Sequence, residues 1–201
     1  MLASITPLGE RGRQSSWRVT ATLYVLGSLA GGAAIGALSG LLGWLALGGI
    51  GTLGSVGLHA RVAALAAMLA AGLAWELARG RVPGPRRQVD ERWLDRYRAW
   101  VYGLGYGAQL GAGLTTVVVS SAVYIVPGAA VLSARPLTGG LIGAVAGGLR
   151  GVTVLTAAQV VTPQRLVAFH ARMRLIERPV RAVALVAQLA LACLASIAAG
   201  V

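Results

Sequence analysis

The chain of 201 residues is 56% hydrophobic and only 12% charged, far less charged than a water-soluble domain of this length. Its net charge of +12 arises from arginine without any lysine, and most of the arginines lie between long apolar runs. This placement excludes a nucleic-acid-binding face, and it predicts charges that orient the chain in a membrane and contact anionic lipid in its cytoplasmic loops. Because the alternation of a membrane β-barrel is absent, we expect an all-α integral membrane protein.

The apolar runs predict about five transmembrane helices in one domain over 19–200, preceded by a basic cytoplasmic tail over 1–18. A run of about 20 apolar residues suffices to cross the hydrocarbon core of a bilayer. The expected helices cover 19–47, 58–78, 99–126, 136–161 and 181–199.

Two arginine-rich loops, 79–97 and 162–180, carry apolar residues at helical spacing and predict short helices on the membrane surface. Pro127 is expected to end the third span and Pro136 to begin the regular part of the fourth.

The arginines also predict an orientation. The tail and the loops 79–98 and 162–181 are basic, whereas the turn 48–57 is uncharged and the turn 126–136 contains only Arg135. By the positive-inside rule we expect a multi-pass protein of the inner (plasma) membrane, with a cytoplasmic N-terminus and an external C-terminus. A six-span arrangement would need a break in the long first or fourth segment.

Glycines recur every fourth residue in three of the expected helices. Glycines at this spacing share one helix face and let another backbone approach closely, so we expect helix packing within the chain or between copies. The alternative is that these faces let helices slide or line a narrow path. The glycines are Gly32, Gly36, Gly40, Gly103, Gly107, Gly111, Gly139, Gly143, Gly147 and Gly151.

A short motif occurs twice in the chain. Ile35-Gly36-Ala37-x-x-Gly40 recurs as Ile142-Gly143-Ala144-x-x-Gly147, and paired glycines precede each copy. Because three spans separate the copies, they would run in opposite directions, as in the inverted repeats of transporters. The alternative is a chance match between helices rich in glycine and alanine.

Glu76 falls inside the expected second span and Arg150 inside the fourth. An intramembrane charge costs roughly 2.5–3.5 kcal/mol at a helix centre and usually has a partner or a task. We predict either a structural Glu76–Arg150 ion pair or two side chains that reach the interface separately. An unpaired Arg150 facing a cavity would bind a small anion.

Polar residues of the third span complete the candidate substrate site. Gln109, Thr115 and Thr116, with Ser120 and Ser121, either hydrogen-bond between helices or line a permeation path.

We expect no metal, no cofactor and no enzymatic activity. His59 and His170 fall on opposite sides of the predicted membrane, and Cys193 is the only cysteine. A metal site or a thiol relay needs ligands or thiols in groups.

The stretch QVDERWLDRYRAWVYGLGYGAQLGAGLTTVVVSSAVYIV, followed by GGLIGAVAGGLRG, resembles the second half of membrane proteins of the cytochrome c biogenesis and thiol–disulfide relay type. These belong with lysine-exporter-like permeases built from three-plus-three inverted repeats. The resemblance covers residues 88–160 and rests on a glycine pattern. The relay members carry a cysteine in the corresponding spans, where this chain has Thr115, Thr116 and the valines at 117–119. The resemblance therefore implies transport or an assembly role, without electron transfer, and assigns no functional residue.

Together these features predict a small permease-like transporter of a small, anionic solute. The alternative is a non-catalytic accessory or assembly subunit of a larger membrane complex. In either case we expect contact with lipid and assembly with further copies or with other membrane subunits.

Overall fold

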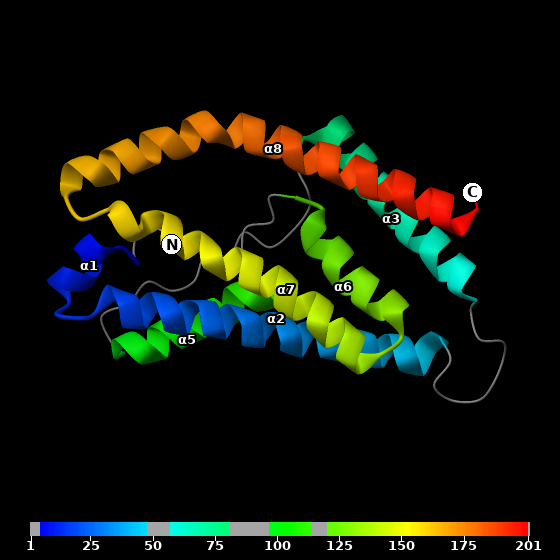
Figure 1. Ribbon diagram of the computed structural model, residues 1–201, viewed down its shortest axis with the longest axis horizontal. Helices are drawn as coiled ribbons and strands as arrows, with labels where there is room; N and C mark the ends of the chain where they lie inside the picture. Colours follow the sequence, from blue (N-terminus) through cyan, green and yellow to red (C-terminus); the bar gives the residue numbers. More distant parts are fainter. Residues whose placement is uncertain (1–4, 48–56, 81–96, 114–119, 201) are drawn as a thin grey trace.

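The computed structural model of the chain describes residues 5–47, 57–80, 97–113 and 120–200, which form helices and no strands. The two ends of the described chain lie at opposite ends of an elongated molecule (Figure 1). In chain order the helices are α1 (Pro7–Gly12), α2 (Trp17–Leu47), α3 (Leu58–Arg79), α5 (Ala99–Ala112), α6 (Ala122–Ser133), α7 (Pro136–Val152), the 3-10 helix η1 (Thr153–Gln159) and α8 (Pro163–Ala199).

Four of these segments are long and apolar enough to cross a membrane: α2, α3, α7 together with η1, and α8. Much of each helix is exposed on the surface of the chain, and its apolar side chains suit the interior of a bilayer. The prediction of an all-helical membrane protein is confirmed at this level.

Helix α2 is the centre of the fold and makes its most extensive contacts with α7 and α5 (Figure 1). It runs antiparallel to α7, with Gly32 opposite Gly143 and Gly36 opposite Gly139. It runs parallel to α5, since Tyr24 lies against Gly107 and the next turn lies against Gly111. A central helix thus has a partner on each of two faces.

Glycine permits both approaches. A methyl group added at Gly36 or Gly143 would overlap a backbone carbonyl of the facing helix, and the same holds at Gly107 and Gly111. All ten glycines with four-residue spacing are buried. The backbones therefore meet directly, as small residues allow in membrane helix pairs.

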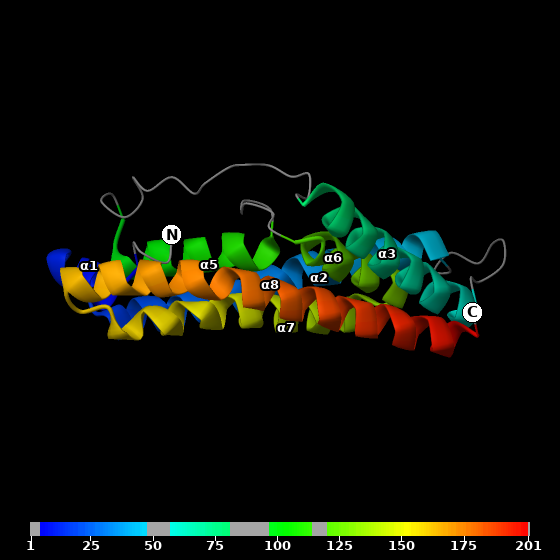
Figure 2. The ribbon, with the colours of Figure 1, turned by 90° about the horizontal axis from the view of Figure 1, so that it is seen from above.

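Helices α3 and α8 form a second group, and α6 packs against both α3 and the first group. Seen from above, α8 extends along nearly the whole length of the molecule (Figure 2). Only Gln188 and Ala192 of its 37 residues are buried. Most of α8 is therefore covered by nothing in the described chain.

Two expected boundaries differ from the structure. The single helix expected over 99–126 is replaced by α5 and α6, and Pro127 lies inside α6 instead of ending a span. The expected surface helix within 162–180 and the last span form one continuous helix, α8, which includes Pro179. Proline is tolerated inside membrane helices because neighbouring groups satisfy the backbone that it leaves free. The surface helix expected before Trp100 falls largely outside the described residues.

The N-terminal segment is folded against the helices. Thr6 caps α1 by accepting from the N–H of Gly9, and Pro7 stands at the first helical position, where its missing N–H is harmless. Leu8 donates its backbone N–H to the Val160 carbonyl after η1. Helix α1 therefore closes the end of the molecule where α2 and α5 begin.

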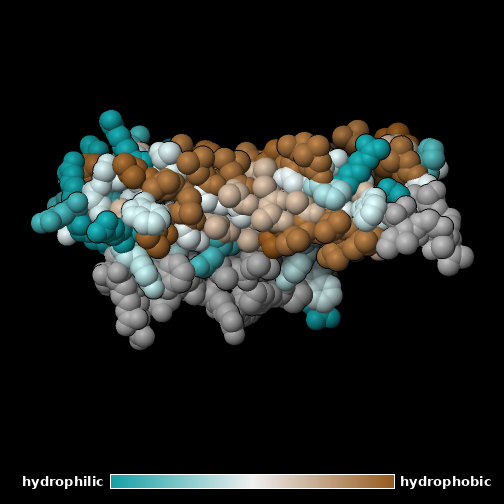
Figure 3. All heavy atoms as spheres, turned by 90° about the horizontal axis from the view of Figure 1, so that it is seen from below, coloured by the Kyte–Doolittle hydropathy of each residue, from teal (hydrophilic) through white to brown (hydrophobic). Residues whose placement is uncertain are grey.

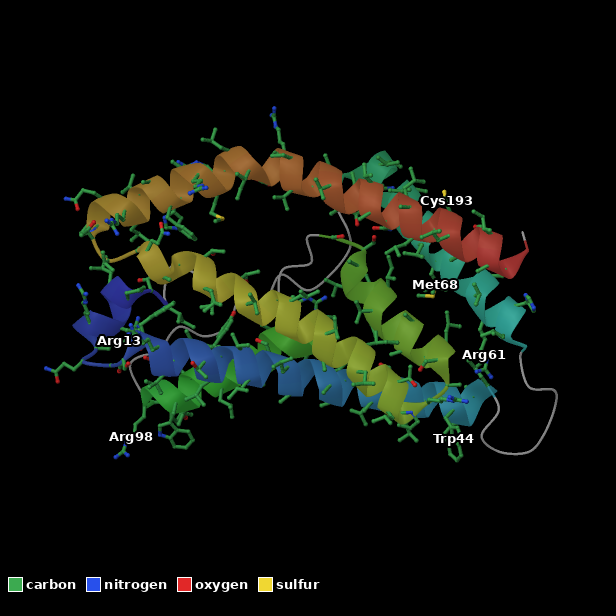
Figure 4. All side chains as sticks on the ribbon, viewed as in Figure 1. Arg13, Trp44, Arg61, Met68, Arg98 and Cys193 are labelled. Carbon is green, nitrogen blue, oxygen red and sulfur yellow. The ribbon has the colours of Figure 1, made fainter. Side chains whose placement is uncertain are left out.

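Polarity is distributed along the long axis. On the face in Figure 3, hydrophobic residues cover the middle and hydrophilic residues gather at the ends, most densely beside α1. Arg13 and Arg98 lie at that basic end, and Trp44 and Arg61 lie at the other (Figure 4). The arrangement suits a bilayer whose normal follows the long axis.

Candidate functional site

The most unusual feature of the bundle is the break between α5 and α6. Helix α5 ends at Gly113, which adopts a left-handed conformation with φ of 70°, and α6 begins after Ser121. Both helices run from the basic end towards the other end, one after the other (Figure 1). The two pieces resemble one crossing interrupted near the middle of the molecule.

Arg150 of α7 lies at the C-terminal end of α5. A Cβ atom added at Gly113 would stand 3.3 Å from Nη1 of Arg150, which places the guanidinium directly beside the helix end. The last carbonyls of a helix carry partial negative charge, so a cation here is favourable. The partial negative charge of this helix end therefore offsets part of the free energy that it costs to bury the Arg150 guanidinium.

Glu76 of α3 lies at the N-terminal end of α6. Its Oε1 atom accepts the hydroxyl of Ser120 at 3.0 Å and, in a very short contact, the backbone N–H of Ser121. The carboxylate is almost wholly buried, with 4% of its residue surface exposed. An anion is favoured where free N–H groups point out of a helix.

Gln188 of α8 extends this polar cluster. Its Nε2 donates to the Leu69 carbonyl of α3 at 2.9 Å and to Ser121 Oγ at 3.1 Å. Arg181 donates to the Glu76 and Gly80 carbonyls at the end of α3. The cluster ties α3, α6 and α8 together at the level of the break.

A cavity of about 300 Å³ adjoins the cluster between α3 and α6. Ser121 reaches it from the break, and Met68 projects from α3 towards α6 (Figure 4). The remaining lining consists of Ala71, Gly72, Trp75, Tyr124 and Ile125. The surface of the cavity is therefore almost entirely apolar.

The predicted ion pair between Glu76 and Arg150 is not formed. Within the described residues, the one ion pair closer than 4 Å joins Arg13 to Glu10. Glu76 and Arg150 instead lie on either side of the break, each at the helix end of opposite polarity. Gln109 lies in α5, one turn before the break, whereas Thr115 and Thr116 lie outside the described residues.

A second buried cluster was not predicted. Glu10 of α1 is fully buried and accepts hydrogen bonds from Thr20 and Tyr102, at 2.8 Å from Thr20 Oγ1 and at 2.7 and 2.8 Å from the phenol. The Thr6-Pro7 pair is the signal in the sequence for a capped helix in this segment. Gln188 was also missed, although an amide inside an apolar span usually bonds to another helix.

The described residues contain no group of three or more metal-ligating side chains. His59 and His170 stand on different helices, and Cys193 projects outward from α8 (Figure 4). No family model, no curated protein and no solved structure matches this chain.

Proposed function

We propose that this protein is a small membrane transporter whose substrate pathway passes the break between α5 and α6. The observation that carries the proposal is a pair of half-helices whose facing ends lie against Arg150 and Glu76. Secondary transporters commonly bind substrates and ions at discontinuous helices near the bilayer midplane. Arg150 would attract a small anion, in keeping with the excess of arginine.

The contacts between α2 and α7 support an inverted repeat as part of the same proposal. The two copies of the motif are 107 residues apart, at Ile35 and Ile142. The first copy lies in α2 and the second in α7, and the two helices run antiparallel, as an inverted repeat requires. Kinship with lysine-exporter-like permeases belongs to the same proposal.

The proposal is tested by anion flux in liposomes that contain the purified protein. Chloride, nitrate and acetate are the probes, and an enclosed fluorescent indicator reports their movement. Arg150→Gln is expected to reduce flux at least tenfold, whereas Arg135→Gln, at the turn between α6 and α7, is expected to leave it unchanged. Equal flux in both variants removes Arg150 from the pathway, and no flux of any probe in the parent protein overturns the proposal for these anions.

One observation favours the alternative of an accessory subunit in a larger complex. Helix α8 exposes a long apolar surface, and its principal packing partner in the described chain is α3. Gentle extraction of the native protein, followed by mass measurement, distinguishes the two functions. A fixed stoichiometric complex with other proteins supports the subunit, and the chain alone or in copies of itself supports the transporter.

A further inference from the structure

The first half of α8 and η1 enclose a groove at the basic end of the molecule, far from the break. Its volume is about 610 Å³, within the range of ligand-binding pockets. The residues that line it are Thr156, Gln159, Val160, Arg165, Ala168, Phe169, Arg172, Met173 and Ile176.

The lining combines two chemistries. Arg165 and Arg172 are seven residues apart in α8, so their side chains share one helix face. Phe169, Met173 and Ile176 form an apolar strip on that same side. No carboxylate is present among these lining residues, so the positive charge of the groove is not neutralised from within.

The arginines are held differently. Nη1 of Arg165 donates to the Gln159 carbonyl at 3.3 Å, which directs this guanidinium across the opening between α8 and η1. Arg172 is exposed and lies about two helical turns further along α8. A guanidinium keeps several donors after one is used, so both residues are able to bind one phosphate together.

We propose that this groove binds one anionic phospholipid. The phosphate would lie between Arg165 and Arg172, and an acyl chain would lie along Phe169, Met173 and Ile176. Charge complementarity and the neighbouring apolar strip favour a lipid over a free anion, because a free anion would leave the apolar strip exposed to water. The site is independent of the proposed transport pathway.

The test is native mass measurement of the purified protein after titration with phosphatidylglycerol or with uncharged phosphatidylcholine. One phosphatidylglycerol is expected to be retained. The double variant Arg165→Gln/Arg172→Gln is expected to weaken its binding by about 30-fold, as two arginines at a membrane surface imply. Arg174→Gln/Arg178→Gln is the matched control, since it removes the same charge from residues of α8 that do not line the groove.

The competing outcomes are distinct. Equal weakening in the two double variants shows general attraction to charge and overturns the proposal, as does equal binding of phosphatidylcholine. Displacement of the lipid by millimolar glycerol phosphate identifies a site for soluble phosphate instead. Loss of a dimer in the first variant alone identifies the groove as a contact between copies. Thermal melting of each variant checks that the fold is retained.

Discussion

Neighbouring glycines of α7 have very different surroundings. A Cβ atom at Gly143 would overlap the Gly32 carbonyl of α2. A Cβ atom at Gly140 would stand 3.5 Å from the Cβ of Ala37, which is an ordinary contact. The four-residue pattern in the sequence distinguishes the two positions, because Gly140 lies outside it. The sequence alone therefore singles out the glycines of α7 that lie closest to the backbone of α2.

Replacing these two glycines separates close packing from helix preference. Gly143→Ala is expected to destabilise the protein by about 1–3 kcal/mol, because the added methyl group forces two backbones apart. Gly140→Ala is expected to be neutral or to stabilise by up to about 1 kcal/mol, because alanine favours the helix. Thermal unfolding in detergent measures both. Equal loss in the two variants would contradict the arrangement of α2 and α7.

The broken crossing made by α5 and α6 depends on other elements. Each helix end at the break exposes backbone groups that lipid cannot satisfy. Glu76 from α3 satisfies the N-terminal side, and Arg150 from α7 lies at the C-terminal side. The break is therefore stable only when α3 and α7 are in place.

Glu76 is expected to hold α6 in position. In Glu76→Ala the N–H of Ser121 and the hydroxyl of Ser120 lose their acceptor, which costs about 1–3 kcal/mol for a buried polar group. Faster hydrogen exchange across 120–133 is the expected signature. Glu76→Gln keeps an acceptor oxygen and is the control, with a smaller change expected. Unaltered exchange in Glu76→Ala would show that α6 does not need this cap.

The sequence predicts α2 and α3 almost to the residue, since each is a long apolar run with glycines after its end. The sequence does not predict the break between α5 and α6, because residues 99–126 contain no charged residue and no proline. A break inside an apolar run becomes visible only through its distant partners, Glu76 and Arg150. The sequence also does not predict that the helix within 162–180 continues through Pro179 into the last span to form α8.

The whole molecule has a basic end and an apolar middle (Figure 3). From the positive-inside rule we propose that the basic end faces the cytoplasm. Helix α3 begins at the end with Arg61, opposite the end where α5 begins with Arg98 (Figure 4). His59 and Arg98 are both exposed and therefore report on opposite sides.

Cysteine labelling measures this orientation. In a Cys193→Ser background, His59→Cys is expected to react with a membrane-impermeant maleimide in intact cells. Arg98→Cys is expected to react only after the membrane is opened. The reverse pattern would place the N-terminus outside. Reaction of both sites in intact cells would contradict a crossing between them.

The position of α2 at the centre of the bundle has a consequence for biosynthesis. Its antiparallel partner α7 ends 105 positions after α2 ends, at Val152 against Leu47. Chains grow at about 5–20 residues per second, so α2 waits about 5–20 s before α7 is complete. During that time α5 is already available to cover one face of α2, but the glycine face that packs on α7 lacks its partner. We therefore expect α2 to remain beside the insertion machinery of the cell until α7 emerges.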